Sequence, residues 1–163
     1  GSTIAKREDR TDSILERINK MYTEHSNADY IILQGGINDY WSKEIEIGEV
    51  TDSYDSQLDE RTFCGAMESM LKKASLNWKG KKIGFICTFK TPAATDFRIY
   101  MNKAMEICKK WSVPYLDLFD NSGLNLYLPE IATLYTKNGD KTHPTDEGYE
   151  IITPKIENWI KTL

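Results

Sequence analysis

Two short motifs, far apart in the sequence, combine residue types that could hydrolyse an ester. His143 follows Asp140 by three residues, a spacing that lets a turn fold the carboxylate onto the imidazole Nδ1 and leaves Nε2 free as a general base. Asn38, in Gly36-Ile37-Asn38-Asp39, has a side-chain amide that could donate to an oxyanion. The motifs thus supply a base, its orienting acid and an oxyanion donor, but no evident nucleophile.

Each motif also has a purely structural interpretation. Asp140 and His143 precede a proline and follow Asn138-Gly139, a strong turn signal, so they could simply form a surface turn. The asparagine and aspartate after Gly36 could likewise bond only to the local backbone. The two motifs occur together, in this order and on the strand pattern described next. This combination favours a catalytic role over two unrelated structural turns.

Three apolar stretches are typical of strands buried in a parallel sheet. They cover residues 28–34, 82–89 and 113–119, and the first is ended by Gly35-Gly36. Asn38 therefore follows the carboxyl end of a buried strand, which is where open α/β sheets bind their ligands.

Apolar residues at helical spacing predict helices before, between and after these strands. The first begins in a capping box, Ser13 to Glu16, and the second carries an apolar stripe from Phe63 to Ala74. The third begins near Asp96, whose carboxylate can cap it. The last helical region follows Pro144 and carries an apolar stripe from Tyr149 to Leu163, and Pro154 should kink it or begin a second segment.

The alternation of helix and strand predicts one α/β domain over residues 1–163, in which helices cover both faces of a parallel sheet. Three strands are few for this architecture, and the sequence starts on a helix with no strand before it. We therefore expect one or two further strands that precede the residues of this sequence.

Two long segments, residues 40–59 and 120–144, are predicted to be loops. The first is polar and acidic and lies directly after the Asn38 motif, so we expect it to shape a pocket. Tyr40 and Trp41 at its start could line an acyl or sugar pocket or could cover the core, and the sequence does not separate these interpretations.

Composition argues against several classes of protein. The 21 basic and 25 acidic residues give a net charge of −4, and no dense basic cluster predicts binding to nucleic acid. No apolar run approaches the length of a bilayer span. The three cysteines, Cys64, Cys87 and Cys108, lack the number and spacing of a disulfide framework or metal site. Reduced cysteines favour the cytoplasm, and a secreted or phage-associated location stays open.

The paired motifs resemble those of the SGNH or GDSL family of serine esterases and lipases. That family's Gly-x-Asn-Asp block is matched by Gly36 to Asp39, and its Asp-x-x-His block by Asp140 and His143. The resemblance implies a three-layer flavodoxin-like fold with a parallel sheet, and ester hydrolysis by a Ser-His-Asp triad without a cofactor or metal. It implies that His143 is the general base, Asp140 its partner and Asn38 an oxyanion donor, with a small-molecule, carbohydrate or lipid ester as substrate.

The sequence departs from the family pattern at its beginning. No Gly-Asp-Ser occurs, so we expect the nucleophile upstream, either cut off or supplied by a separate chain, and this segment alone to be inactive. The family's second oxyanion donor is a backbone N–H of a glycine, for which Gly1 in Gly1-Ser2-Thr3 is a candidate. Gly1-Ser2 could equally be a remnant of a cloning vector.

Two functions of other kinds stay open beside ester hydrolysis. A catalytically silent binding or structural module, for example in a cell-surface or phage tail protein, would also lack a nucleophile. In an unrelated α/β domain both motifs would be accidental turns, and Asn38 and His143 would lie at opposite ends of the sheet.

Overall fold

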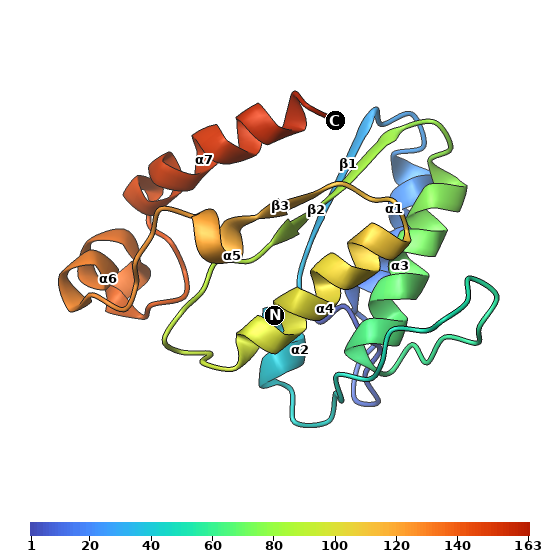
Figure 1. The fold of residues 1–163 in the computed structure, drawn as a ribbon, viewed down its shortest axis with the longest axis horizontal. Coiled ribbons are helices and arrows are strands. Elements are labelled where there is room, and N and C mark those ends of the chain that lie inside the picture. Colours follow the sequence, from blue (N-terminus) through green and yellow to red (C-terminus); the bar gives the residue numbers. More distant parts are fainter.

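The computed structural model describes residues 1–163 and contains a parallel sheet between layers of helices (Figure 1). Strands β1 (Tyr30–Gln34), β2 (Lys82–Cys87) and β3 (Tyr115–Asp117) pair in the order β1-β2-β3, and both pairs are parallel. This confirms the predicted α/β class and its parallel sheet. Each strand is shorter than its apolar stretch, and β1 and β3 are the edge strands.

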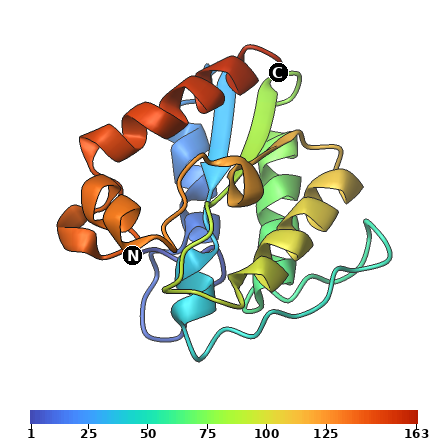
Figure 2. The same ribbon diagram turned by 60° about the vertical axis from the view of Figure 1, so that its left-hand side comes forward.

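Helices cover both faces of the sheet, as predicted. Alternate side chains of the strands, such as Leu33 and Phe85, enter a large core that is shared with α1 (Ile14–Glu24), α3 (Phe63–Asn77) and α4 (Phe97–Lys110). This core lies on one face, and Figure 2 shows these three helices on that side of the strands.

The opposite face of the sheet is covered by α7 (Asp146–Ile160). Ile86 of β2 packs there in a second, smaller core together with Ile152 of α7. Gly84 has no side chain, which leaves room for the Trp159 ring to lie directly against the strand.

Helix starts follow the sequence in one case and not in another. At α1 the capping box forms, because Ser13 Oγ accepts from the Glu16 N–H and the Glu16 carboxylate accepts from the Ser13 N–H. Asp96 does not cap α4 with its side chain, contrary to the prediction. Its ψ of 6° is not extended, so its carboxylate is not directed at the free N–H groups, and its carbonyl accepts from Ile99 instead.

Pro154 does not begin a second helical segment, so that alternative of the prediction is wrong. Helix α7 is assigned continuously from Asp146 to Ile160. Pro154 and Glu150, whose carbonyl loses its usual helical partner, are both exposed, so water can hydrate that carbonyl.

Short helices occupy parts of the segments predicted to be loops. Helix α2 (Ile37–Trp41) begins directly after Gly36, and α5 (Leu118–Asn121) follows β3 without a gap. Helix α6 (Pro129–Tyr135) and the short 3-10 helix η1 (Lys137–Gly139) precede the Asp140 motif. They are too short for helical periodicity to identify.

Residues 42–62 have no regular structure and run along α3 and α4, away from the carboxyl end of β1 (Figure 1). Glu68 of α3, whose side chain is fully buried, holds this segment by accepting from the Thr51 N–H at 2.8 Å. The same carboxylate accepts from Lys110 Nζ at 2.5 Å and from the Trp111 indole N–H at 2.9 Å. Burial opposes ionisation of Glu68, but these donors outweigh it and lower its pKa.

The three cysteine side chains are buried and unpaired. Burial raises the pKa of Cys64 and of Cys87 to about 12, which keeps both thiols protonated and unreactive at neutral pH. None of the helices is both long enough and apolar enough to span a lipid bilayer.

Glu60 joins the N-terminal segment to α3. Its carboxylate pairs with Lys6 and, at 2.9 Å, with Lys73, and it accepts from Ser69 Oγ at 2.5 Å. Burial opposes ionisation of Glu60, but the two ammonium groups and the hydroxyl together lower its pKa to about 2.

The pKa of Glu60 predicts a pH-dependent contribution to stability. Because the folded pKa lies below that of the unfolded chain, this contribution is complete above about pH 4.5 and is lost as the pH falls towards 2. We expect Glu60→Gln to lower the free energy of unfolding by about 2 kcal/mol at pH 7, since a quarter of the side chain is exposed and partly screened, and by almost nothing near pH 2.

Urea unfolding at several pH values measures this difference. Glu157→Gln, at an exposed position without an ion pair, is the control and should show no such trend. If Glu60→Gln lowered the free energy of unfolding equally at pH 7 and near pH 2, the lowered pKa of Glu60 would not be the source of this stability.

Candidate active site

A pocket of about 360 Å³ opens at the carboxyl ends of β1 and β2. Five separate parts of the chain line it. They are the N-terminus (Gly1 and Ser2), the start of α1 (Ile14), the end of β1 with α2 (Gln34, Gly35, Ile37, Asn38 and Trp41), the loop after β2 (Thr88, Phe89 and Thr91) and the segment entering α7 (Thr142, His143, Pro144 and Tyr149). Figure 2 shows the N-terminus beside the segment that leads into α7, and residues of both line the pocket.

Asn38 is placed in the pocket by a turn that only glycine accommodates well. Gly36 has a φ of 109°, and a β-carbon there would lie 3.1 Å from Met101 Cε. The Asn38 amide donates to the Ser2 carbonyl at 3.0 Å, which occupies one of its two hydrogens. The other hydrogen makes no bond and is available to a ligand.

Gly1 lies directly against this amide. A β-carbon on Gly1 would collide with Nδ2 of Asn38, so a larger residue could not occupy the same place without a shift. The structure therefore brings the two candidate oxyanion donors together at one side of the pocket.

Asp39 fixes the N-terminal segment beside the pocket, a role that the sequence did not reveal. Its side chain is fully buried and accepts from the Ile4 N–H at 2.8 Å and from the Ala5 N–H at 2.8 Å. Burial raises the pKa of the Asp39 carboxyl, although the backbone donors act in the opposite direction. These bonds hold the residues that directly follow Gly1 and Ser2, whose own carbonyls accept from Arg10 at 2.8 Å and from Asn38 at 3.0 Å.

Asp140 and His143 form a compact turn. Asp140 Oδ2 lies 2.7 Å from His143 Nδ1, and Oδ1 accepts from the backbone N–H groups of Thr142 at 2.8 Å and His143 at 2.9 Å. Partial burial opposes ionisation of Asp140, but the backbone and ring donors outweigh it and lower its pKa. An ionised carboxylate here accepts from Nδ1–H and so selects the tautomer whose Nε2 is unprotonated.

The imidazole of His143 is open to the pocket. Its side chain is 68% exposed, and Nε2 makes no hydrogen bond. An Nε2 atom that is free, basic and backed by a carboxylate can accept a proton from a hydroxyl group in the pocket. The other histidine, His25, lies at the end of α1, where its carbonyl accepts from the Trp78 indole, outside the pocket.

The two aromatic residues after Asn38 have different roles. The Tyr40 ring packs edge-on against Phe97, with centroids 5.8 Å apart, and so belongs to the core. Trp41 lines the pocket and is 41% exposed. Tyr149 on the first turn of α7 is an exposed lining residue that the sequence assigned only to an apolar stripe.

The expectation that residues 40–59 shape the pocket is wrong beyond Trp41. No other residue after Trp41 in that segment lines the pocket, because Glu68 holds the segment on the side of α3 and α4.

Ser2 is the only serine among the lining residues. Ser13 caps α1, and Ser69 bonds to Glu60 at the other side of the core. The His, Cys, Asp and Glu side chains nowhere gather in a group of three that could hold a metal ion.

A parallel sheet covered by helices, with an imidazole–carboxylate pair and a free amide donor at its carboxyl edge, is an arrangement suited to a hydrolase of the α/β class. The sequence profile of the GDSL-like Lipase/Acylhydrolase family matches residues 1–160. The chain belongs to this family of hydrolases, which confirms the resemblance inferred from its motifs.

Several solved structures share the fold. One crystal structure is 28% identical, with a TM-score of 0.84 over 99% of this chain and 76% of its own. A protein from Lactobacillus plantarum is 24% identical, with a TM-score of 0.82 over 99% of this chain and 77% of its own. The lipase/acylhydrolase from Enterococcus faecalis is 17% identical, with a TM-score of 0.62 over 93% and 72%. A search of curated proteins gives no match.

Proposed function

We propose that the protein hydrolyses carboxylic esters, with His143 as general base and acid, Asp140 as its orienting partner, and Asn38 and Gly1 as oxyanion donors. The observation that carries the proposal is that the carboxylate-backed imidazole and the free Asn38 amide hydrogen face one pocket. These groups are three of the four that acyl transfer to a hydroxyl requires.

The proposed reaction begins when His143 Nε2 takes the proton of a serine hydroxyl as its oxygen attacks the ester carbonyl. The carbonyl oxygen becomes an oxyanion, which accepts from the second Asn38 hydrogen and the Gly1 N–H. Collapse breaks the bond to the alcohol, which leaves with the proton from Nε2. Water then attacks the acyl-enzyme in the same way and releases the acid and the free serine.

We propose that the nucleophile is a serine outside residues 1–163, on a further strand that pairs with the free edge of β1 or on a separate chain. In support, β1 pairs only with β2, and its carboxyl end opens into the pocket. A parallel strand added there would end beside Asn38 and His143. Without such a strand, this segment alone would be inactive.

Ser2 is the alternative nucleophile within the chain, because it lines the pocket. Its carbonyl bonds to the Asn38 amide, so its position is tied to the oxyanion side of the site.

The substrate that we propose is a small-molecule ester, with a carbohydrate or lipid portion outside the pocket. A volume of about 360 Å³ is at the small end of the range of ligand pockets. Trp41 and Tyr149 present exposed rings at the pocket, where the alcohol portion of an ester could lie against them.

A fluorophosphonate that labels activated serines tests the proposal on the intact protein. We expect one labelled serine, located by peptide mass mapping outside residues 1–163, together with hydrolysis of p-nitrophenyl acetate. Ser2→Ala should leave both unchanged. Labelling of Ser2 would instead make it the nucleophile, and neither labelling nor hydrolysis would contradict the esterase proposal. That last result would favour a silent binding module.

A further inference from the structure

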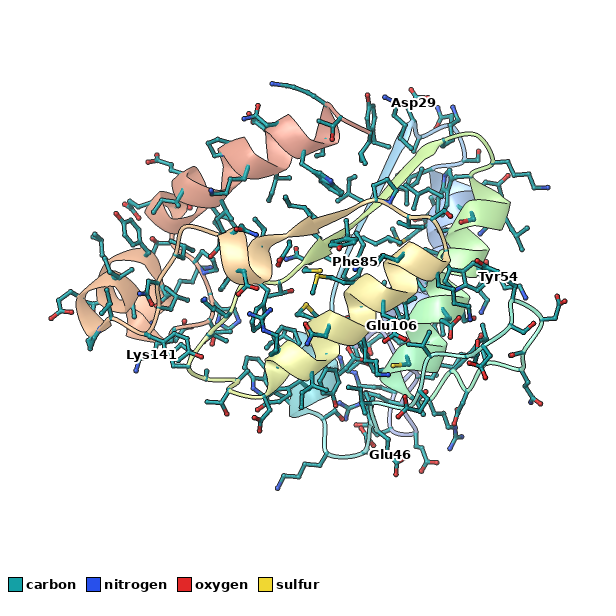
Figure 3. The ribbon with its side chains drawn as sticks, viewed as in Figure 1. Asp29, Glu46, Tyr54, Phe85, Glu106 and Lys141 are labelled. Atoms are coloured by element: carbon teal, nitrogen blue, oxygen red, sulfur yellow. The ribbon has the colours of Figure 1, made fainter.

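The Asp140–His143 turn is joined to the rest of the pocket by a single hydrogen bond. Thr91 Oγ1, in the loop from β2 to α4, donates to the Lys141 carbonyl at 2.5 Å. Every other hydrogen bond of residues 137–144 stays within that segment or goes to Thr136, immediately before it. Figure 3 places Lys141 between α6 and the loop that leads from β2 to α4.

The Thr91 bond belongs to a chain that reaches the oxyanion side of the pocket. Thr91 Oγ1 accepts from the Ala93 N–H at 3.1 Å, and the Ala93 carbonyl accepts from the Trp41 indole at 3.4 Å. Trp41 lies on α2 together with Asn38. Hydrogen bonds therefore link the helix that carries Asn38 to the turn that carries His143.

The backbone of Lys141 has an unfavourable conformation, which hydrogen bonds on both sides of the residue stabilise. Its φ is 62°, in the left-handed region that residues other than glycine rarely adopt. Its N–H donates to Thr136 Oγ1 at 3.0 Å while its carbonyl accepts from Thr91. Both threonines are buried, with 2% exposure for Thr91 and 1% for Thr136, so loss of either hydroxyl would remove a hydrogen bond made from a packed position.

The packing of His143 itself does not set its position, because two thirds of its side chain is exposed. Its ring is bonded to Asp140 within the same turn, so the two side chains move together with the backbone between them. The distance from this pair to Asn38 therefore depends on what holds Lys141.

We propose that Thr91 is a positioning residue. Its hydrogen bond to the carbonyl of Lys141 keeps the Asp140–His143 turn at a fixed distance from Asn38. The inference rests on the proposed function, because it concerns the geometry of that reaction. Misplacement of a catalytic group by about 1 Å can lower the rate by about 100-fold.

Thr91→Val, which keeps the shape and removes the hydroxyl, tests this in the intact protein. We expect kcat for p-nitrophenyl acetate to fall by about 10- to 100-fold with KM changed by less than about 3-fold. Thr91→Ser restores the hydroxyl and should recover most of kcat. Amide hydrogen exchange of Lys141, which does not need turnover, should be about 10-fold faster in Thr91→Val than in the wild type.

Ser122→Ala is the matched control. Ser122 is also buried and its hydroxyl also accepts from the N–H two residues later, that of Leu124, but it lies outside the pocket. We expect this variant to lose stability without a change in kcat or in Lys141 exchange.

Three outcomes would overturn the proposal. They are an unchanged Lys141 exchange in Thr91→Val, a failure of Thr91→Ser to recover kcat, and an equal loss of kcat in Ser122→Ala. If the wild-type protein hydrolyses no ester, the proposed function fails, and the exchange measurement alone still decides whether Thr91 holds the turn.

Discussion

Replacement of His143 by alanine is expected to lower kcat for ester hydrolysis by about 10⁴- to 10⁶-fold. Without the imidazole, no group in the pocket can take the proton of the attacking hydroxyl or return it to the leaving alcohol. KM should change little, because the ring is mostly exposed and contributes little apolar contact. Stopped-flow or long-time assays with p-nitrophenyl acetate on the intact protein measure the loss.

His25→Ala is the control for this experiment. His25 is the only other histidine and lies outside the pocket at the end of α1, so its removal should leave kcat unchanged. Circular dichroism and the melting temperature of His143→Ala should equal those of the wild type. If His143→Ala keeps more than a tenth of the activity, another base operates and the proposed mechanism is wrong.

Asp140→Asn should lower kcat by about 10⁴-fold. The amide oxygen of asparagine can still accept from the N–H groups of Thr142 and His143, so the turn should persist. What is lost is the negative charge beside Nδ1, which selects the productive tautomer and stabilises the protonated ring. The pKa of Asp140 lies below its usual value, so the wild-type carboxylate is ionised throughout the neutral pH range. The factor by which Asp140→Asn lowers kcat should therefore not vary with pH in that range.

The ¹⁵N chemical shifts of the His143 ring report on the tautomer directly. We expect Nδ1 to carry the proton in the wild type and the proton to move towards Nε2 in Asp140→Asn. Asp146→Asn, which alters an exposed carboxylate on the next helix, should change neither the shifts nor kcat. An Asp140→Asn variant with normal activity would show that the pair has only a structural role.

The parts of this fold that depend on local pattern could be predicted from the sequence. Apolar periodicity located the strands and the four long helices, and the Ser13 capping box forms as expected. The errors at Asp96 and Pro154 arise because capping depends on a backbone angle, and tolerance of proline depends on exposure, neither of which residue types specify.

The site was predictable where its residues are close together in sequence. Asp140 and His143 bond within one turn, and Gly36 and Asn38 share one motif. Thr91 and Asp39 were missed because their partners are distant in the sequence: 50 residues separate Thr91 from Lys141, and 35 separate Asp39 from Ile4. Such pairs depend on the packed fold, and no local pattern indicates them.

The hydrogen bonds of Glu68 affect the access of substrates to the pocket. Its buried carboxylate, bonded to Thr51 and Lys110, fixes the acidic segment after α2 along the outer helices. Swinging that segment across the pocket would break the hydrogen bonds of Thr51 to Glu68 and Lys110, each of which involves a charged group and contributes about 1.5–3 kcal/mol. The segment is thus held against the outer helices, and we do not expect it to act as a lid that opens for an ester to enter or for an acid to leave.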